Sequence, residues 1–469
     1  MNKKFAMAGT LAMLLSGCSL IPEYQSPDAP IPATWPKGPA YEGTPIQPVA
    51  ATSMESALGV DFFRAPQLRR LIEQALTNNR DLRVAVLNVE AARAQYRIQR
   101  ADQLPGISAE GSAVRQRMPA GIMGPTATTN GQYEAGIGLT AFEVDLFGRV
   151  HSLGQQALEQ FFATQEARTG AQVMLVAEVA NAALTLLADE KRLALTEQTL
   201  ATRQRSFDLI RRGFEQGIGT QLDVAQAQTV LEAARANRER YVRQVAQDRN
   251  ALTLLLGAPL EGNALAGLSL GDELIADVPA GLSSGVLLNR PDIREAEHRL
   301  KAANANIGVA RAAFYPRITL IGSLGTASDD LGDLFSGGTG AWNFMPSLTL
   351  PIFDAGRNEA NLDTALANRD IAVARYEKTI QTAFRDVADA LAARSTLDRQ
   401  LLAQDRLVAA TRQSYELAQA RYDRGIDNFL NVLDAQRSLY GAEEEKIGLE
   451  LFRLTNRVNL YKALGGGNF

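Results

Sequence analysis

The side chains that most often carry out chemistry are scarce in this sequence. Its 469 residues include one cysteine, Cys18, and two histidines, His151 and His298, which lie far apart in the chain. A single cysteine cannot form an intramolecular disulfide, and two distant histidines offer neither zinc-ligand spacing nor a catalytic triad. The sequence also lacks a glycine-rich phosphate-binding loop followed by lysine. We therefore predict no catalytic residue, no metal site and no cofactor, and hence a protein that is not an enzyme.

The cysteine is placed for a different reaction, the attachment of a lipid. Two lysines and a short apolar stretch precede it, as in a secretory signal peptide, and Leu15-Ser16-Gly17-Cys18 resembles the bacterial lipoprotein processing box. We predict a signal peptide at residues 1–17 and acyl chains such as palmitate on Cys18, with each buried CH₂ contributing about 0.8 kcal/mol to anchoring. Ser19 follows, and no Asp stands there to suggest retention in the inner membrane. An ordinary signal peptide with an incidental cysteine is the alternative.

The composition favours closely packed helices. Hydrophobic residues make up 46% of the chain but aromatic residues only 6%, so Ala and Leu carry most of the apolar content. This balance is typical of helices that approach one another closely. The net charge of −4 gives no reason to expect a nucleic-acid partner.

The sequence contains an internal repeat. FEQGIGTQLDVAQAQT (214–229) is similar to YDRGIDNFLNVLDAQR (422–437), and residues 80–112 pair without gaps with residues 291–323. A repeat of this length indicates a duplicated unit rather than a solenoid of short repeats. The predicted organisation is a lipidated, Pro-rich extended segment at 18–64, a first repeat at 65–257, a connecting, equatorial segment at 258–290 and a second repeat at 291–469.

Within each half the hydrophobic period changes in the same order. Apolar residues at helical spacing come first, then two segments in which apolar and polar residues alternate, then a very long Ala-rich helix and a shorter helix. The alternating segments have about ten residues, enough to cross a bilayer as tilted strands, and aromatic residues such as Tyr133 and Trp342 gather near their ends. The predicted elements are a helix at 66–103, strands at 106–118 and 132–144 and helices at 149–212 and 221–256, and then a helix at 291–313, strands at 317–327 and 341–352 and helices at 355–421 and 429–464.

The repeated turn joins the long helix of each half to the shorter one. Glycine can adopt positive φ in such a tight reversal, and Thr, Asn or Asp can cap the next helix. We expect positive φ at Gly217, Gly219 and Gly425, a capping box formed by Thr220 and Asp223, and a cap at Asp427 or Asn428. Turn chemistry alone is sufficient to explain these residues.

The strands set the expected assembly. After the signal peptide no run of 18 apolar residues occurs, so a chain that crosses a membrane would do so as a closed β-barrel. Four strands cannot close a barrel, eight from two chains would be filled by side chains, and twelve from three chains leave a lumen. We predict a mainly α fold with a membrane β-barrel: a homotrimer with a 12-stranded barrel and a coiled-coil helical barrel whose tips lie about 100 Å away in the periplasm.

Several motifs are similar to those of the outer-membrane factor (TolC-like) family, in its OprM-like lipoprotein branch. They include NNRDLRVAVLNVEAARAQYRIQRA (78–101), EVDLFGRV (143–150), LNRPDIREAEHRLKAANANIGVARAAFYPRI (288–318) and LDAQRSLY (433–440). The resemblance covers essentially the whole chain from Cys18 and implies a trimeric outer-membrane exit channel of a tripartite multidrug or solvent efflux pump. Its partners would be a periplasmic adaptor (membrane fusion) protein, an inner-membrane proton-driven transporter of the resistance–nodulation–division (RND) type, and outer-membrane lipid.

The resemblance also implies roles for the two turns. In the family a ring of Leu, Asp and Arg closes the periplasmic end at rest, and these residues fall on Leu430, Asp434 and Arg437, which share one helix face. Solvated helix positions are the alternative for Asp434 and Arg437. The family places adaptor contacts at the tips, here Gly217, Gly219, Thr220, Asp223, Gly425, Asp427, Asn428 and Asn431.

Two other functions stay open on the sequence alone. A duct of the same fold could serve type I protein secretion, although the LSGC box, the PDIREAE stretch and the KALGGG ending favour the efflux branch. A lipoprotein that braces the envelope and conducts nothing is the third possibility, which alternating strands with aromatic ends do not favour.

Asp329, Asp330 and Asp333 could hold a cation, but a solvated loop is the more common outcome.

Overall fold

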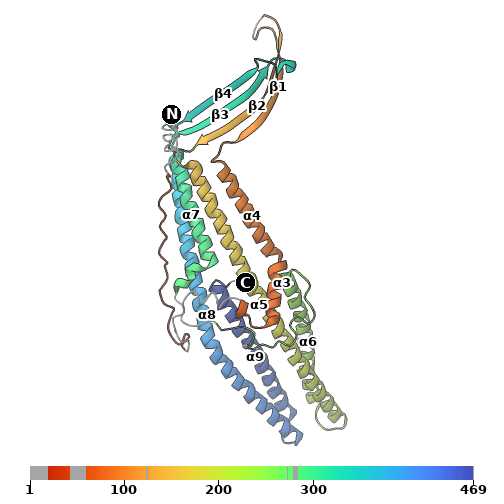
Figure 1. Cartoon of the computed structure of the whole chain (residues 1–469). Helices are drawn as coiled ribbons and strands as arrows, with labels where there is room; N and C mark the ends of the chain where they lie inside the picture. The colour runs from red at the N-terminus through yellow and green to blue at the C-terminus, as the bar shows by residue number, and fades with distance from the viewer. Residues whose placement is uncertain (1–18, 43–59, 123–124, 272, 278–283, 468–469) are drawn as a thin grey trace. The chain divides into compact units, whose positions relative to one another are not determined.

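The computed structural model describes residues 19–42, 60–122, 125–271, 273–277 and 284–467, so the predicted signal peptide and Cys18 lie outside the described residues. In both halves the elements follow the predicted order of helix, two strands, long helix and shorter helix (Figure 1). The elements are η1 (Val60–Phe62), α3 (Pro66–Asn78), α4 (Arg80–Ala101), β1 (Ile107–Met118), β2 (Thr128–Val144), α5 (Arg149–Glu215), α6 (Gln221–Leu256), η2 (Ser284–Asn289), α7 (Pro291–Ala312), β3 (Arg317–Ser328), η3 (Leu331–Asp333), β4 (Gly340–Thr349), α8 (Arg357–Asp423) and α9 (Phe429–Ala463).

Contacts divide the chain into two compact units, and each unit contains segments from both sequence halves. The first comprises the described residues up to Asp28 together with Leu87–Glu166 and Arg294–Glu377. The second comprises Ala29–Val86, Ala167–Ile293 and the chain from Lys378 onward. All four strands lie in the first unit, and both hairpin turns lie in the second.

The prediction of one helix over residues 66–103 is wrong, because Asn79 divides it into α3 and α4. The Asn79 Oδ1 accepts a hydrogen bond from the Leu82 amide (2.9 Å), and its Nδ2 donates to the Leu255 carbonyl (2.9 Å). Asn79 therefore caps α4 while it binds the last turn of α6. α6 ends just before Gly257, which has φ +64° in the left-handed region, and a Cβ there would lie 2.4 Å from the Asn78 carbonyl oxygen.

The four strands form one antiparallel sheet in the order β1-β2-β3-β4. One face is apolar: Ile137 pairs with Leu324, which pairs with Trp342, and all three side chains are more than half exposed. The other face is polar, as in the row formed by Gly138, Ser323 and Asn343. The predicted alternation is thus confirmed. A sheet with an exposed apolar face and two edge strands is suited to a membrane and to pairing with further strands.

Two strand boundaries differ from the prediction by more than one residue. β2 begins at Thr128, because the β1–β2 pairing continues to the pair Met118–Thr128. Tyr133 therefore lies inside β2 and not near its end. β4 ends at Thr349, where its pairing with Arg317 of β3 stops. Both changes come from cross-strand register, which the alternation of one strand cannot specify.

β2 and β3 approach each other closely at a pair of facing glycines. Gly136 and Gly325 are cross-strand partners. A Cβ on Gly325 would lie 2.2 Å from the Ala135 carbonyl oxygen and 2.6 Å from the Gly136 Cα, and one on Gly136 would lie 2.6 Å from the Leu324 carbonyl oxygen. No side chain fits either position, so this approach of the two backbones requires glycine.

The two long helices each contain 67 residues. The expectation of no sufficiently apolar segment after the signal peptide needs a correction, because α5 holds an 18-residue window that is apolar enough to cross a membrane by length and composition. Within the chain 61% of that window is buried, with Val179, Ala180 and Leu184 at most 1% exposed. This stretch of α5 therefore forms protein core.

The core of the second unit continues from α5 into aromatic contacts near the chain's end. Phe62, Phe63 and Tyr461 are fully buried, and their ring centroids lie 5.1–5.4 Å apart. In the N-terminal segment, residues 19–42 contain no helix or strand, and Val60–Phe62 form η1. In the second unit this segment places Trp35 on Phe384 of α8, with 4.8 Å between ring centroids.

Candidate functional site

The first repeated turn joins α5 to α6. Gly217 and Gly219 have φ values of +77° and +97°, in the region that favours glycine. The Thr220 Oγ1 accepts a hydrogen bond from the Asp223 amide (3.2 Å), and the Thr220 amide donates to the Asp223 Oδ2 (2.8 Å). The predicted capping box is therefore present, and it fixes the first turn of α6.

The second repeated turn joins α8 to α9. Gly425 has φ +71°, and of the two predicted caps Asn428 is the one used, its Oδ1 accepting from the Asn431 amide (3.4 Å). Asp427 instead forms an ion pair with Arg421, with 2.6 Å between its Oδ2 and the Arg421 Nε. The hydrogen bond from this guanidinium lowers the pKa of the Asp427 carboxyl. The two turns thus share a glycine with positive φ and a side-chain cap, and the second turn adds the ion pair between Arg421 and Asp427.

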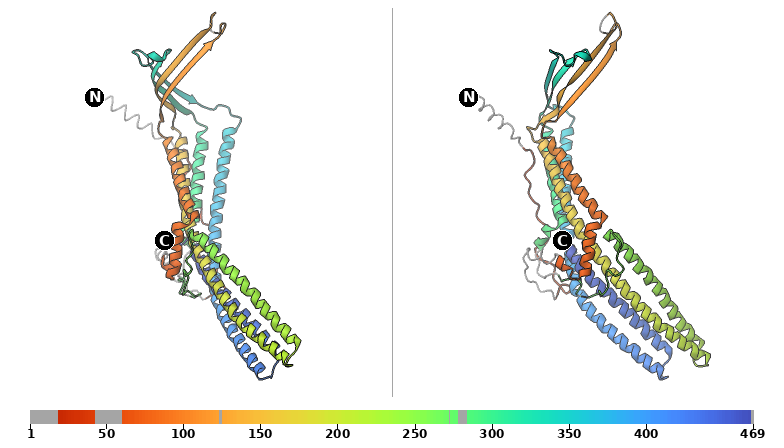
Figure 2. Two further views of the ribbon diagram at one scale, coloured as in Figure 1. Left: turned by 90° about the vertical axis from the view of Figure 1, so that its right-hand side faces the viewer. Right: turned by 45° about the vertical axis from the view of Figure 1, so that its right-hand side comes forward.

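A shared apolar cluster, the tip cluster, joins the two hairpins behind these turns. It contains side chains of the first hairpin and of the start of α9, with further residues of α5 and α8 packed against them. Figure 2 shows the two hairpins side by side in both views. The buried members are Ile210, Val224, Ala227, Val230, Phe429, Val432 and Leu433, and Phe207, Tyr415, Ala418 and Tyr422 pack against them. The first turns of α9 are therefore held against the first hairpin.

The three predicted gate residues lie on the other, exposed face of α9. Leu430 is 41% exposed. The Arg437 Nη1 lies 3.5 Å from the Asp434 Oδ1, and both side chains are more than half exposed. Asp434 and Arg437 thus form an ion pair within their own helix, on a surface that is open in a single chain.

The buried face of α9 carries functional candidates that the sequence did not reveal. Leu433, Gln436 and Tyr440 are buried at helical spacing. The Tyr440 Oη lies 2.9 Å from the Thr196 Oγ1, and the guanidinium of Arg203 lies 5.5 Å from the centre of the Tyr440 ring. The spacing in LDAQRSLY could have indicated the buried face, but not its partners on α5.

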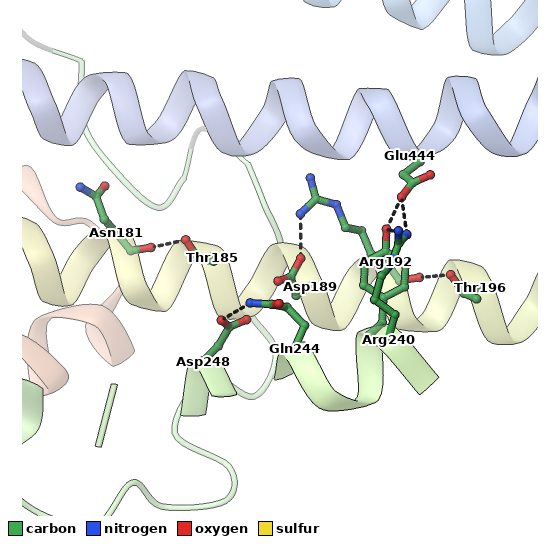
Figure 3. A network of polar contacts seen from close by, with 10 residues as sticks. Asn181, Thr185, Asp189, Arg192, Thr196, Arg240, Gln244, Asp248 and Glu444 are labelled. Carbon is green, nitrogen blue, oxygen red and sulfur yellow. Dashed lines mark hydrogen bonds and ion pairs between the residues drawn. The ribbon is translucent and has the colours of Figure 1, made fainter. Parts of the chain in front are cut away.

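A second polar network lies farther from the tips and joins α5, α6 and α9 (Figure 3). The Arg192 Nη1 donates to the Asp189 Oδ1 (2.7 Å), and the Gln244 Nε2 donates to the Asp248 Oδ1 (3.1 Å). Burial and the nearby Asp189 raise the pKa of Asp248 to about 6. From α9, Glu444 accepts hydrogen bonds from two residues of α6, Arg240 and Tyr241. The first two of these hydrogen bonds each lie within one helix, whereas the bonds from Arg240 and Tyr241 to Glu444 link α6 to α9.

The acidic loop between β3 and β4 has a structural role. The Asp330 Oδ1 accepts a hydrogen bond from the Gly332 amide (2.7 Å) and so caps η3. Among the described residues, no group of three or more His, Cys, Asp or Glu side chains is arranged to hold a metal ion.

The comparisons with known proteins agree on one family. The model of the family described as outer membrane efflux protein matches residues 71–258 and 282–466. The chain is 52% identical over 469 residues to the probable efflux pump outer membrane protein TtgC of Pseudomonas putida, covering 100% of this chain and 96% of the relative. It is 47% identical over 461 residues to the outer membrane protein OprJ of Pseudomonas aeruginosa, covering 97% and 94%.

A solved structure agrees with these relatives. The open state of the Neisseria gonorrhoeae MtrE outer membrane channel matches with a TM-score of 0.85 and 40% identity, covering 96% of this chain and 98% of that one. The fold, the sequence and the family model therefore point the same way. The chain belongs to the outer membrane efflux protein family.

Proposed function

We propose that this chain is the outer-membrane exit channel of a tripartite efflux pump, that it works with a periplasmic adaptor and an inner-membrane proton-driven RND transporter, and that it is not an enzyme. The sheet carries the proposal, because one face is apolar and exposed and the edges β1 and β4 have no further strand partner among the described residues. Backbone groups at such edges must be paired inside a membrane, which requires closure into a barrel. Relatives named as toluene and antibiotic efflux pump proteins support solvents and antibiotics as the substrates.

The proposed assembly is a homotrimer. Three copies bring twelve strands, which close a barrel wide enough to leave a lumen. In this arrangement β4 of each copy pairs with β1 of the next, and the apolar face contacts lipid. Acyl chains on Cys18 would add a second anchor beside the barrel.

The proposed gate is formed by Leu430, Asp434 and Arg437 from each of the three copies. Their exposure in a single chain leaves them free to meet across the axis, where leucines narrow the opening and Asp434 can exchange its own Arg437 for a neighbour's. The adaptor would bind the two turns of each chain. The tip cluster supports both roles, because it fixes the turns and the start of α9 relative to each other.

Transport in cells tests the proposed function. We expect the chain to restore efflux of a fluorescent dye, and growth in the presence of toluene, in a host that has an RND pump and its adaptor but lacks their own outer-membrane channel. An inactive pump should abolish both effects, because the energy comes from the pump.

The alternatives give different outcomes in the same strain. A secretion duct would leave dye accumulation unchanged and would release a protein substrate when supplied with an ATP-driven exporter. An envelope brace would restore neither. Either result, obtained with the chain correctly inserted in the outer membrane, would contradict the efflux function.

A further inference from the structure

We propose that Arg203 is a further residue of the gate: its guanidinium, buried beneath Tyr440 and paired with no carboxylate of the described residues, opposes the packing of α9 on α5 and so favours opening. This inference rests on the proposed channel function. It concerns the buried face of α9, which lies next to the exposed face that carries Leu430, Asp434 and Arg437.

Arg203 is buried, and its guanidinium has few polar partners. The residue is 6% exposed, and its Nη1 donates to the Val230 carbonyl of α6 (3.0 Å). Among the residues that the structure describes, its buried Nε has no hydrogen-bond acceptor, and no carboxylate forms an ion pair with Arg203. Burial of the guanidinium lowers the pKa of Arg203; the nearby Tyr440 opposes this shift in part, and the positive charge of Arg437 adds a smaller lowering. A cation is thus buried with incomplete compensation.

The aromatic ring of Tyr440 covers this cation. The Thr196 hydroxyl donates to the Arg192 carbonyl (2.8 Å), so its oxygen is left to accept from the Tyr440 hydroxyl (2.9 Å). This hydrogen bond holds the Tyr440 ring over the guanidinium of Arg203, at 5.5 Å. The cation–π contact offsets only part of the lost hydration of the arginine, because a neutral ring replaces water less completely than a carboxylate would.

A movement of α9 would change the contact between Tyr440 and Arg203. Tyr440 and the gate residues share one helix, so a displacement of α9 that widens the gate also lifts the ring from Arg203 and admits water to the guanidinium. Burial of the Arg203 charge makes the packed state less stable than it would be with an apolar side chain at this position. Hydration of the guanidinium stabilises the displaced state. Arg203 and Tyr440 therefore act in opposite directions: the arginine favours opening and the tyrosine favours closure.

The experiment measures open probability in planar bilayers, with purified trimers that carry Leu430→Ala so that openings are frequent. We expect Arg203→Met, which replaces the cation by an apolar chain of similar length, to lower the ratio of open to closed time by about tenfold, a change that corresponds to about 1.4 kcal/mol. Tyr440→Leu should raise the same ratio. Arg203→Lys keeps the buried charge and should stay close to the parent.

The matched control is Arg205→Met, which makes the same change at an exposed position of α5; it should leave the ratio unchanged. A second readout is the thermal unfolding midpoint of the otherwise wild-type trimer, which should rise with Arg203→Met and fall with Tyr440→Leu. The midpoint needs no current, so it tests the contact even if the channel does not open.

The outcomes separate this inference from the proposed function. If Arg203→Met lowers the midpoint or raises the open time, as loss of a purely structural contact would, the inference is wrong and the channel stands. The same holds if Arg203→Met fails to assemble while Arg203→Lys assembles. If no variant and no wild-type trimer passes current, the proposed function fails.

Discussion

Replacing Leu430 and Asp434 together by alanine is expected to raise the time-averaged conductance of the purified channel about tenfold or more, since about 1.4 kcal/mol lost from the closed state changes the open-to-closed ratio tenfold. Two losses contribute. Alanine at 430 removes the side chain that narrows the opening, and alanine at 434 leaves Arg437 without the carboxylate that lies 3.5 Å away in this chain. The comparison is made between wild-type and variant trimers in planar bilayers.

A matched control comes from α8. Asp398 and Leu402 have the same four-residue spacing as Leu430 and Asp434 and are more than half exposed, at 60% and 55%. Asp398, like Asp434, has an arginine partner on α9, with 3.7 Å between its Oδ1 and the Arg453 Nη1. Their replacement by alanine should leave conductance unchanged. If the gate variant and the wild type conduct alike, the channel remains but its closure lies elsewhere, and the assignment of Leu430, Asp434 and Arg437 is wrong.

Gly325→Val should abolish assembly in the outer membrane. The Cβ would lie 2.2 Å from the Ala135 carbonyl oxygen, and backbone atoms cannot yield as a flexible side chain can. Overpacking of a fitted contact costs about 1–3 kcal/mol and occasionally more, and here the clash separates β2 from β3, so every copy would lose the continuity of its sheet. The amount of heat-sensitive oligomer in isolated outer membranes measures the effect.

Gly340→Val provides the control for this substitution. Gly340 begins β4, and a Cβ at that position would meet no atom of the described residues within 4 Å. This variant should assemble normally, because valine favours the extended conformation of a strand. Normal assembly of Gly325→Val would mean that β2 and β3 do not approach as the structure has them.

The features that were predicted correctly from the sequence are local ones. The alternation in β1 to β4, the long Ala-rich helices, the positive φ of Gly217 and the capping box of Thr220 all depend on residues that are close in sequence. The order of elements could be predicted for the same reason, because the period of apolar residues changes at each boundary.

Features that depend on distant contacts were missed. The helix break at Asn79 is stabilised by the Leu255 carbonyl, far away in sequence, and the early start of β2 depends on its register with β1. Likewise, Arg203 and Tyr440 are ordinary helix residues until α5 and α9 are packed together. The gate could be named only by resemblance, because its closure would require other copies of the chain.

Disulfide cross-linking between edge strands tests most directly whether three chains close one barrel. Cys18 is the sole natural cysteine, so Ser112→Cys on the polar face of β1 can be combined in turn with cysteine at Ala341, Asn343, Met345 or Ser347 on the same face of β4. A disulfide forms only where the two Cα atoms lie within about 7 Å. In oxidised outer membranes we expect at least one pair to give a covalent product that stops at three chains. A product that stops at two chains, or a ladder that continues beyond three, would contradict the trimeric channel.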